Sequence, residues 1–185
     1  MNTPQENIRA LTDLKDPRLY REPKRITAAR DATARAFEQI PNDMGVGLVS
    51  AENCPLAHSA GFYAPERRFA LLNRIKGLFP VGGTPLADGL RKAGQMIDGV
   101  NREALILVIS DGEESCNGDP CAVARELAKA KPHVTINVVD ILSSGGANCA
   151  AEATGGKVYT AATVSEIQIM TNRAVEEYIP EGCTP

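Results

Sequence analysis

The sequence lacks several features that would assign a chain of 185 residues to a class at once. No apolar run approaches the ~20 residues that a membrane-spanning helix needs, and the longest covers residues 104–109. Lysine and arginine do not cluster and the pI is near 5.5, so a nucleic-acid-binding surface has no electrostatic support. The opening residues, Met-Asn-Thr-Pro-Gln-Glu, are polar and contain no apolar core of a signal peptide.

Catalytic motifs are absent as well. The sequence contains no Gly-x-Gly-x-x-Gly turn for dinucleotides, no Gly-x-x-x-x-Gly-Lys-Ser/Thr loop for nucleotide phosphates and no Gly-x-Ser-x-Gly nucleophile turn. Only two histidines are present, His58 and His133, and neither is placed to complete a Ser/His/Asp or Cys/His set. We therefore predict that the protein is not an enzyme.

The composition that is present fits one soluble globular domain, with 43% hydrophobic and 23% charged residues. Short apolar strands alternate with amphipathic helices, which predicts an α/β fold with an open, mostly parallel sheet covered by helices on both faces. The continuous apolar run over residues 104–109 is typical of a strand buried on both faces. We expect helices over 24–39, 65–78, 85–97, 120–130, 147–154 and 164–179, and strands over 46–49, 58–63, 104–109, 134–141 and 158–160.

Two segments fall where ligands bind in such folds, beyond the carboxyl ends of the strands. Thr84 ends a Gly-Gly-Thr turn that enters a helix, and Asp111 directly follows the strand over residues 104–109. A hydroxyl and a carboxylate are oxygen ligands that suit Mg²⁺. The structural alternatives are that Thr84 caps a helix whose first residue is Pro85, and that Asp111 forms an Asp-Gly turn.

These two motifs, in this order and spacing, resemble a von Willebrand factor type A (VWA) domain. The likeness rests on Gly-Gly-Thr-Pro-Leu-Ala-Asp-Gly-Leu at 82–90 and Ala-Leu-Ile-Leu-Val-Ile-Ser-Asp-Gly-Glu-Glu at 104–114, and it extends from residue 24 to residue 179. The resemblance implies a doubly wound, Rossmann-like fold with a metal-ion-dependent adhesion site. In that site an Asp-x-Ser-x-Ser loop, a threonine and an aspartate hold Mg²⁺ (or Mn²⁺ or Ca²⁺), and a partner's acidic side chain commonly completes the coordination. Thr84 and Asp111 match the threonine and the aspartate.

The Asp-x-Ser-x-Ser loop has no match in this sequence. Because a methionine commonly follows that loop in the family, we expect Met1 to be that methionine, and the central first strand and the remaining ligands to lie outside this chain. We assign residues 1–23 to a loop, 24–179 to the VWA-like domain and 180–185 to a tail. A sheet without its central strand has two unpaired edges and an apolar slot, so we expect marginal stability and weak or absent metal binding.

Five cysteines are many for a reducing compartment, and an odd number leaves one without an internal partner. Cys116 and Cys121 flank a short loop in which a local disulfide is feasible. The alternative is a zinc site that uses this Cys-x₄-Cys spacing with His58 or His133. The other cysteines have no pairing that the sequence determines: Cys54, Cys149 and Cys183. Disulfides would favour a periplasmic or extracellular location.

The leading functional hypothesis is a binding module that recognises a protein partner through a metal bridge. A second hypothesis is a doubly wound enzyme acting on a phosphorylated small molecule, with the Gly-rich turn over residues 143–147 donating N–H groups to the anion. A third is a metal-free scaffold domain. The charged pairs Glu113–Glu114 and Arg67–Arg68 are expected to be solvated.

Overall fold

The structure is a computed structural model that describes residues 25–79 and 82–179. The expected loop over 1–23, the expected tail over 180–185 and Cys183 lie outside the described residues. In chain order the elements are α1 (Arg25–Glu38), β1 (Val46–Ser50), β2 (His58–Tyr63), a 3₁₀ turn η3 (Pro65–Arg67), α2 (Arg68–Lys76), α3 (Leu86–Met96), β3 (Ala104–Ser110), α4 (Pro120–Ala130), β4 (Val134–Ile141), α5 (Asn148–Thr154), β5 (Val158–Ala161) and α6 (Val164–Glu176). None of these helices is long and apolar enough to span a membrane.

The strands form two sheets. β3, β4 and β5 make a parallel sheet in that order, and β1 and β2 make an antiparallel pair. β3 and β4 stay in register from Ala104 opposite Val134 to Ser110 opposite Asp140. Among the strands that the structure describes, none pairs with the second edge of β1 or of β3. The α/β fold class is therefore confirmed.

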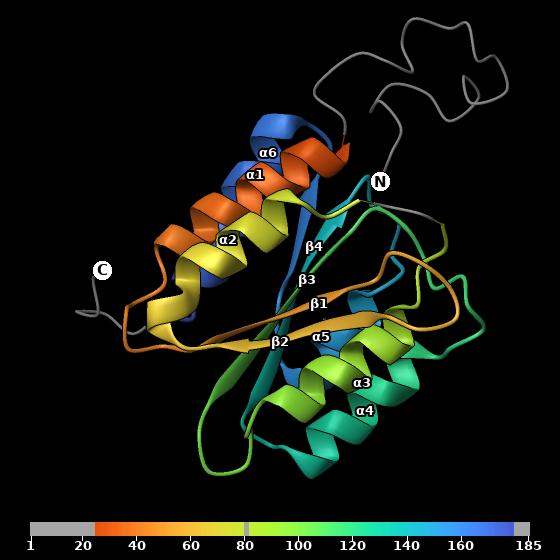
Figure 1. The fold of residues 1–185 in the computed structure, drawn as a ribbon. Coiled ribbons are helices and arrows are strands. Elements are labelled where there is room, and N and C mark those ends of the chain that lie inside the picture. Colours follow the sequence, from red (N-terminus) through yellow and green to blue (C-terminus); the bar gives the residue numbers. More distant parts are fainter. Residues whose placement is uncertain (1–24, 80–81, 180–185) are drawn as a thin grey trace, which may run out of the picture.

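Helices cover both faces of this strand layer (Figure 1), with α1, α2 and α6 on one face and α3, α4 and α5 on the other. On one face, Leu90 of α3 packs with Ile106 of β3, and α3 also lies against β1 and β2. On the other face, Phe37 of α1 packs with Leu48 of β1, while alanines earlier in α1 pack with Ile141 of β4. The two sheets are thus held in one layer by shared helices rather than by hydrogen bonds between them.

Burial differs between the two longest strands. β4 is buried at every position except Thr135, whereas buried and half-buried residues alternate over most of β3. The apolar run of β3 had predicted complete burial. Its half-buried positions accompany its unpaired edge, because a central strand is covered by a neighbour on each side as well as by helices on each face.

Side-chain capping fixes the starts of two helices. The carboxylate of Asp119 accepts a hydrogen bond from the N–H of Ala122 at the start of α4, at 2.8 Å. Thr163 and Glu166 form a reciprocal capping box at the start of α6. Both caps satisfy backbone N–H groups that a helix leaves without internal partners.

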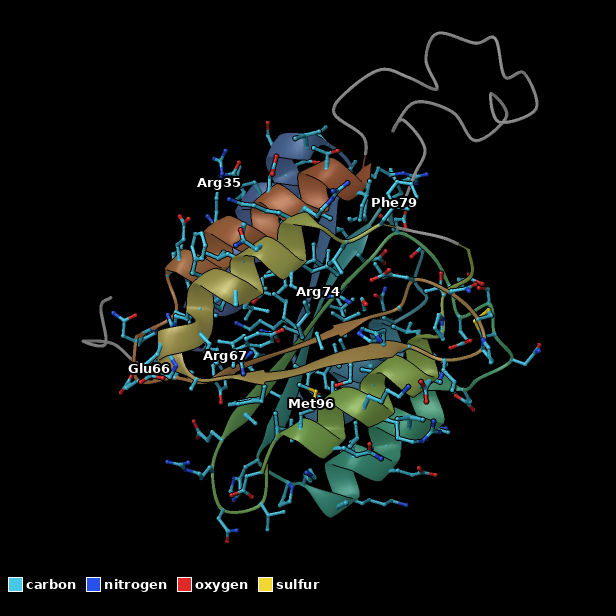
Figure 2. All side chains as sticks on the ribbon, viewed as in Figure 1. Arg35, Glu66, Arg67, Arg74, Phe79 and Met96 are labelled. Carbon is cyan, nitrogen blue, oxygen red and sulfur yellow. A yellow bond between two sulfur atoms is a disulfide. The ribbon has the colours of Figure 1, made fainter. Side chains whose placement is uncertain are left out.

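Arg68 departs from the expectation that it is solvated. Its guanidinium lies over the ring of Phe37 and donates to the backbone carbonyls of the turn after α1, at Ile40, Pro41 and Met44. Its neighbour Arg67 is exposed, as expected. Figure 2 shows Arg67 at one end of the β1–β2 pair.

Asn137 joins β4 to α6 and to the start of β5. It is buried in β4, its Nδ2 donates to the carbonyl of Ala174 in α6 at 2.8 Å, and its Oδ1 accepts from the N–H of Lys157 just before β5 at 2.9 Å. An amide is suited to this position because one end donates while the other accepts.

We predict that Asn137→Ala lowers the free energy of unfolding by about 2–4 kcal/mol, because it leaves the buried carbonyl of Ala174 and the part-buried N–H of Lys157 without their partners. Urea unfolding followed by circular dichroism measures the change. Asn73→Ala on the exposed surface of α2 is the matched control and should change stability by less than about 0.5 kcal/mol. Equal losses in the two variants would contradict the structural role of Asn137.

Candidate functional site

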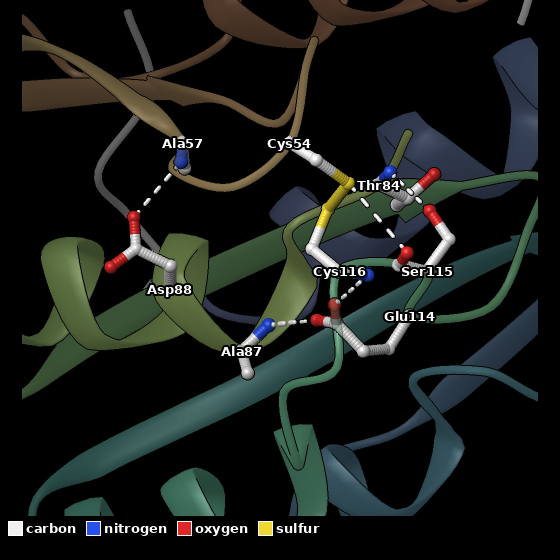
Figure 3. The surroundings of a disulfide bond; sticks show 8 residues. All are labelled: Cys54, Ala57, Thr84, Ala87, Asp88, Glu114, Ser115 and Cys116. Carbon is white, nitrogen blue, oxygen red and sulfur yellow. Dashed lines mark hydrogen bonds between the residues drawn. A yellow bond between two sulfur atoms is a disulfide. The ribbon is translucent and has the colours of Figure 1, made fainter. Parts of the chain in front are cut away.

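Three loops meet at the carboxyl ends of β1 and β3 (Figure 3). They are residues 51–57 after β1, residues 82–85 before α3 and residues 111–119 after β3, and we call them the strand-end cluster. The N–H of Gly82 donates to the carbonyl of Glu52 at 2.9 Å, and the N–H of Cys54 donates to the carbonyl of Gly82 at 3.2 Å. These bonds join the first two loops.

Ser115 joins the second loop to the third. Its Oγ accepts from the N–H of Thr84 at 2.6 Å, and its own N–H donates to the carbonyl of Thr84 at 3.1 Å. Ser115, four positions after Asp111, therefore binds both the N–H and the carbonyl of Thr84. The structure brings the loops of both predicted metal ligands together in this way.

The prediction that Thr84 caps α3 is wrong. The helix begins at Leu86, Pro85 occupies the N-cap position, and no side chain of that residue or its neighbours caps the helix locally. Pro85 adopts a ψ of 66°, which is outside the helical range, so the turn places Thr84 one residue too early to cap.

Glu114 performs the capping instead. One carboxylate oxygen accepts from the N–H of Ala87 in the first turn of α3 at 2.8 Å, and the other accepts from the N–H of Cys116 at 2.6 Å. A carboxylate is favourable there because the N-terminus of a helix carries partial positive charge. The expectation that Glu114 is solvated is therefore wrong, and no local pattern could have revealed a cap supplied from 27 residues away.

The disulfides differ from the predicted pair. Cys54 is bonded to Cys116 and Cys121 to Cys149, with Cα atoms 5.4 Å apart in each case. A Cys116–Cys121 bond is therefore wrong, because Cys121 lies in the first turn of α4 beside α5, whereas Cys116 precedes Asn117, whose φ of 65° redirects the chain. The short separation of Cys116 and Cys121 in sequence therefore did not predict which cysteine each of them contacts.

The zinc alternative is also wrong for the cysteines that the structure describes, because all four are oxidised. His58 and His133 are exposed. Within residues 25–79 and 82–179, no group of three His, Cys, Asp or Glu side chains is arranged to hold a metal ion.

Asp111 lies against a cation from another layer of the fold. The Nη1 atom of Arg25, the first residue of α1, is 3.4 Å from Oδ2 of Asp111, and the two side chains are only 7% and 15% exposed. Sequence analysis missed Arg25 because its contact with Asp111 depends on how α1 packs across the sheet.

Thr84 and Asp111 by themselves do not fit a divalent cation. Mg²⁺ takes octahedral oxygen coordination, and these residues provide one hydroxyl and one carboxylate that already faces a guanidinium. Of the residues that the structure describes, these two therefore supply only part of an octahedral set of oxygen donors.

Asp88 fixes the loop after β1 to α3. Its carboxylate accepts from the N–H of Ala57 at 2.9 Å and forms an ion pair with Lys92 at 2.9 Å, while the Lys92 ammonium also donates to the carbonyl of Ala57. Desolvation acts to raise the pKa of Asp88. The hydrogen bonds from Lys92 and from Ala57 together outweigh this effect, so the net shift of the pKa is downward. An ionised Asp88 thus holds this side of the strand-end cluster.

Asp140 occupies the Gly-rich turn that could have bound an anion. It is buried at the end of β4 and accepts from the N–H groups of Ser144 and Gly145, at 2.7 and 2.9 Å, and from the Asn148 amide at 3.1 Å. Because these donors already bind a carboxylate of the chain itself, the turn offers little to a phosphate.

The sequence matches the von Willebrand factor type A domain over residues 13–114. Two uncharacterised Bacillus subtilis proteins are similar: YwmC is 30% identical over 105 residues, covering 54% of this chain and 45% of YwmC, and YwmD is 28% identical over 113 residues, covering 57% and 50%. The chain thus spans about half the length of the curated relatives it matches.

Solved structures share the fold. BatB from Bacteroides thetaiotaomicron superimposes with a TM-score of 0.67 at 15% identity, covering 84% of this chain and 89% of BatB. A von Willebrand factor type A protein from Catenulispora acidiphila gives 0.67 at 19% identity, covering 82% and 39%. Proximal thread matrix protein 1 from the mussel byssus, with a zinc-occupied MIDAS motif, gives 0.69 at 14% identity, covering 86% and 42%.

The matched segment carries the features that suggested the resemblance. Residues 13–114 include both the Thr84 turn and the Asp111 loop, and they make up more than half of the 185 residues. The chain belongs to the von Willebrand factor type A domain family.

Proposed function

We propose that this chain is a non-enzymatic, protein-binding VWA domain that contacts its partner with the strand-end cluster. The observation that carries this proposal is that Glu114, and not Thr84, caps α3. Glu114 caps α3, while Ser115 fixes the backbone of Thr84, so the Thr84 hydroxyl is placed at the cluster without serving as a helix cap.

The cluster has the properties of a preorganised binding surface. A disulfide, the Asp88 ion pair and the Ser115 hydrogen bonds fix its loops, so little conformational entropy remains to be lost on binding. Leu56, at 63% exposed, and Glu113 provide an apolar and a charged contact at its rim.

The metal ion of the family has an incomplete site in this chain. The sequence contains no Asp-x-Ser-x-Ser loop, and Arg25 places a positive charge beside Asp111. We therefore propose that Thr84 and Asp111 would hold Mg²⁺, Mn²⁺ or Ca²⁺ only where further ligands join them, with an acidic side chain of the partner completing the coordination. The zinc-occupied MIDAS motif of the mussel byssus protein supports a metal role for this kind of site.

The two alternatives receive less support. An enzyme acting on a phosphorylated small molecule would need the turn over 143–147, whose N–H groups bind Asp140. The metal-free scaffold hypothesis would apply if no partner binds the strand-end cluster. The two disulfides support an extracytoplasmic location, since such bonds persist in oxidising compartments.

We predict that Mg²⁺ or Mn²⁺ at millimolar concentration leaves the melting temperature of this chain unchanged relative to EDTA, because the donor set is incomplete. Differential scanning calorimetry of the wild type and of Asp111→Ala measures this. A rise in melting temperature with Mg²⁺ that Asp111→Ala abolishes would show that this chain holds a complete metal site.

We predict that partner capture depends on the strand-end cluster. Leu56→Ser and Thr84→Lys should each weaken binding of the protein captured from an extract of the native source by roughly tenfold, since a few contacts carry most of the binding energy of a protein interface. Lys129→Ala, an exposed change at the far end of α4, is the control and should leave binding unchanged. Affinity is measured with the purified captured protein by titration calorimetry.

Two results would contradict the proposal. Equal binding by the wild type and by both cluster variants would place the partner elsewhere on the domain. Stabilisation of the wild type by nucleotides or sugar phosphates would favour the enzyme hypothesis instead.

A further inference from the structure

We propose that the Cys54–Cys116 disulfide is a redox-sensitive tether that holds the Thr84 turn in its binding geometry, and that a dithiol reductant releases this turn without unfolding the domain. The effect on partner binding rests on the proposed function. The tether itself is a property of this chain and can be tested separately.

The position of the bond gives it this role. Cys54 follows β1 and Cys116 follows β3, so the bond joins the ends of two strands from different sheets. The described strands β1 and β3 are not paired with each other by backbone hydrogen bonds. Near the bond, the backbone hydrogen bonds between the loops of the strand-end cluster are few: Gly82 pairs with Glu52 and with Cys54, and Ser115 pairs with Thr84. A covalent bond is therefore a large part of what keeps these loops together.

The disulfide also packs directly on the turn. Gly83 has a φ of 81°, and a Cβ atom at this position would lie 2.4 Å from Sγ of Cys54 and 3.4 Å from Sγ of Cys116. The two sulfur atoms thus lie against the residue that precedes Thr84, and only glycine combines this backbone angle with such close approach. Separation of the two sulfurs removes the surface on which the turn rests.

A second connection runs through the chain beside Cys116. Its N–H donates to Glu114, whose other oxygen caps α3, and the preceding residue Ser115 binds Thr84 on both sides. Movement of Cys116 therefore reaches the Thr84 turn and the first turn of α3 through short hydrogen bonds. The core contacts of α3 with β3 lie deeper and do not involve the sulfurs.

The bond is open to reduction. Both cysteines are half-buried on loops rather than inside helices. A thiolate of the reductant attacks one sulfur and displaces the other as a thiolate, which takes up a proton; the second thiol of the reductant, as its thiolate, then attacks the mixed disulfide. The products are two cysteine thiols and the oxidised, cyclic reductant, so two electrons and two protons are transferred to the protein.

The second disulfide is a natural control. Cys121 and Cys149 are also half-buried, but they join α4 to α5, whose buried residues pack together in the main core. These are Val123, Ala124, Ala150 and Ala151. Loss of that bond should leave the helices in place, because apolar packing holds them independently.

Hydrogen exchange measured by mass spectrometry tests the tether. All variants carry Cys183→Ser so that the fifth cysteine cannot exchange into either bond. In Cys54→Ser/Cys116→Ser, peptides covering 82–87 and 112–117 should exchange at least tenfold faster, while peptides covering 104–110 and 134–141 stay protected. Cys121→Ser/Cys149→Ser should leave the 82–87 and 112–117 peptides unchanged, and dithiothreitol added to the parent should reproduce the first pattern.

Two other exchange patterns would overturn the tether. Unchanged exchange at 82–87 and 112–117 would mean that the hydrogen bonds alone hold the turn. Loss of protection throughout, including 134–141, would mean that the bond supports the whole fold rather than a local segment. If exchange changes as expected while partner capture does not, the tether stands and the proposed function of the cluster fails.

Discussion

The parallel pairing of β3 with β4 is the constraint on which the rest of this domain depends. It places the carboxyl ends of both strands at one edge, where Asp111 follows one strand and Asp140 is the next-to-last residue of the other. The helices packed on this pair then hold the antiparallel β1–β2 pair in the same layer. The strand-end cluster exists because these packing contacts, and not a continuous sheet, align β1 with β3.

Local chemistry made the elements of this fold predictable. Asp119 before Pro120, the Thr163–Glu166 capping box and the glycine after α5 mark helix ends in the structure through contacts within a few residues. Apolar runs over β3 and β4 identified the parallel strands for a similar reason. The family likeness followed from two short motifs whose spacing survives in the sequence.

The site was less predictable because its important contacts are distant in sequence. Glu114 caps a helix 27 residues away, Cys116 pairs with a cysteine 62 residues away, and Arg25 reaches Asp111 across the layers of the fold. Each contact depends on tertiary packing, which the local residue pattern does not predict. From local pattern alone, we expected Cys116 to pair with Cys121, Thr84 to cap α3 and Glu114 to be solvated, and each expectation was wrong.

The Cys54–Cys116 bond has a further, mechanical consequence. It closes the segment between these residues, with β2, α2, α3 and β3 inside it, into a covalent loop. A stretching force applied to the two ends of the chain passes through the sulfurs and bypasses that loop. The fully extended oxidised chain is therefore shorter by about 200 Å, at ~3.5 Å for each residue spanned. Under load, the oxidation state of this bond would therefore set how far the chain can extend.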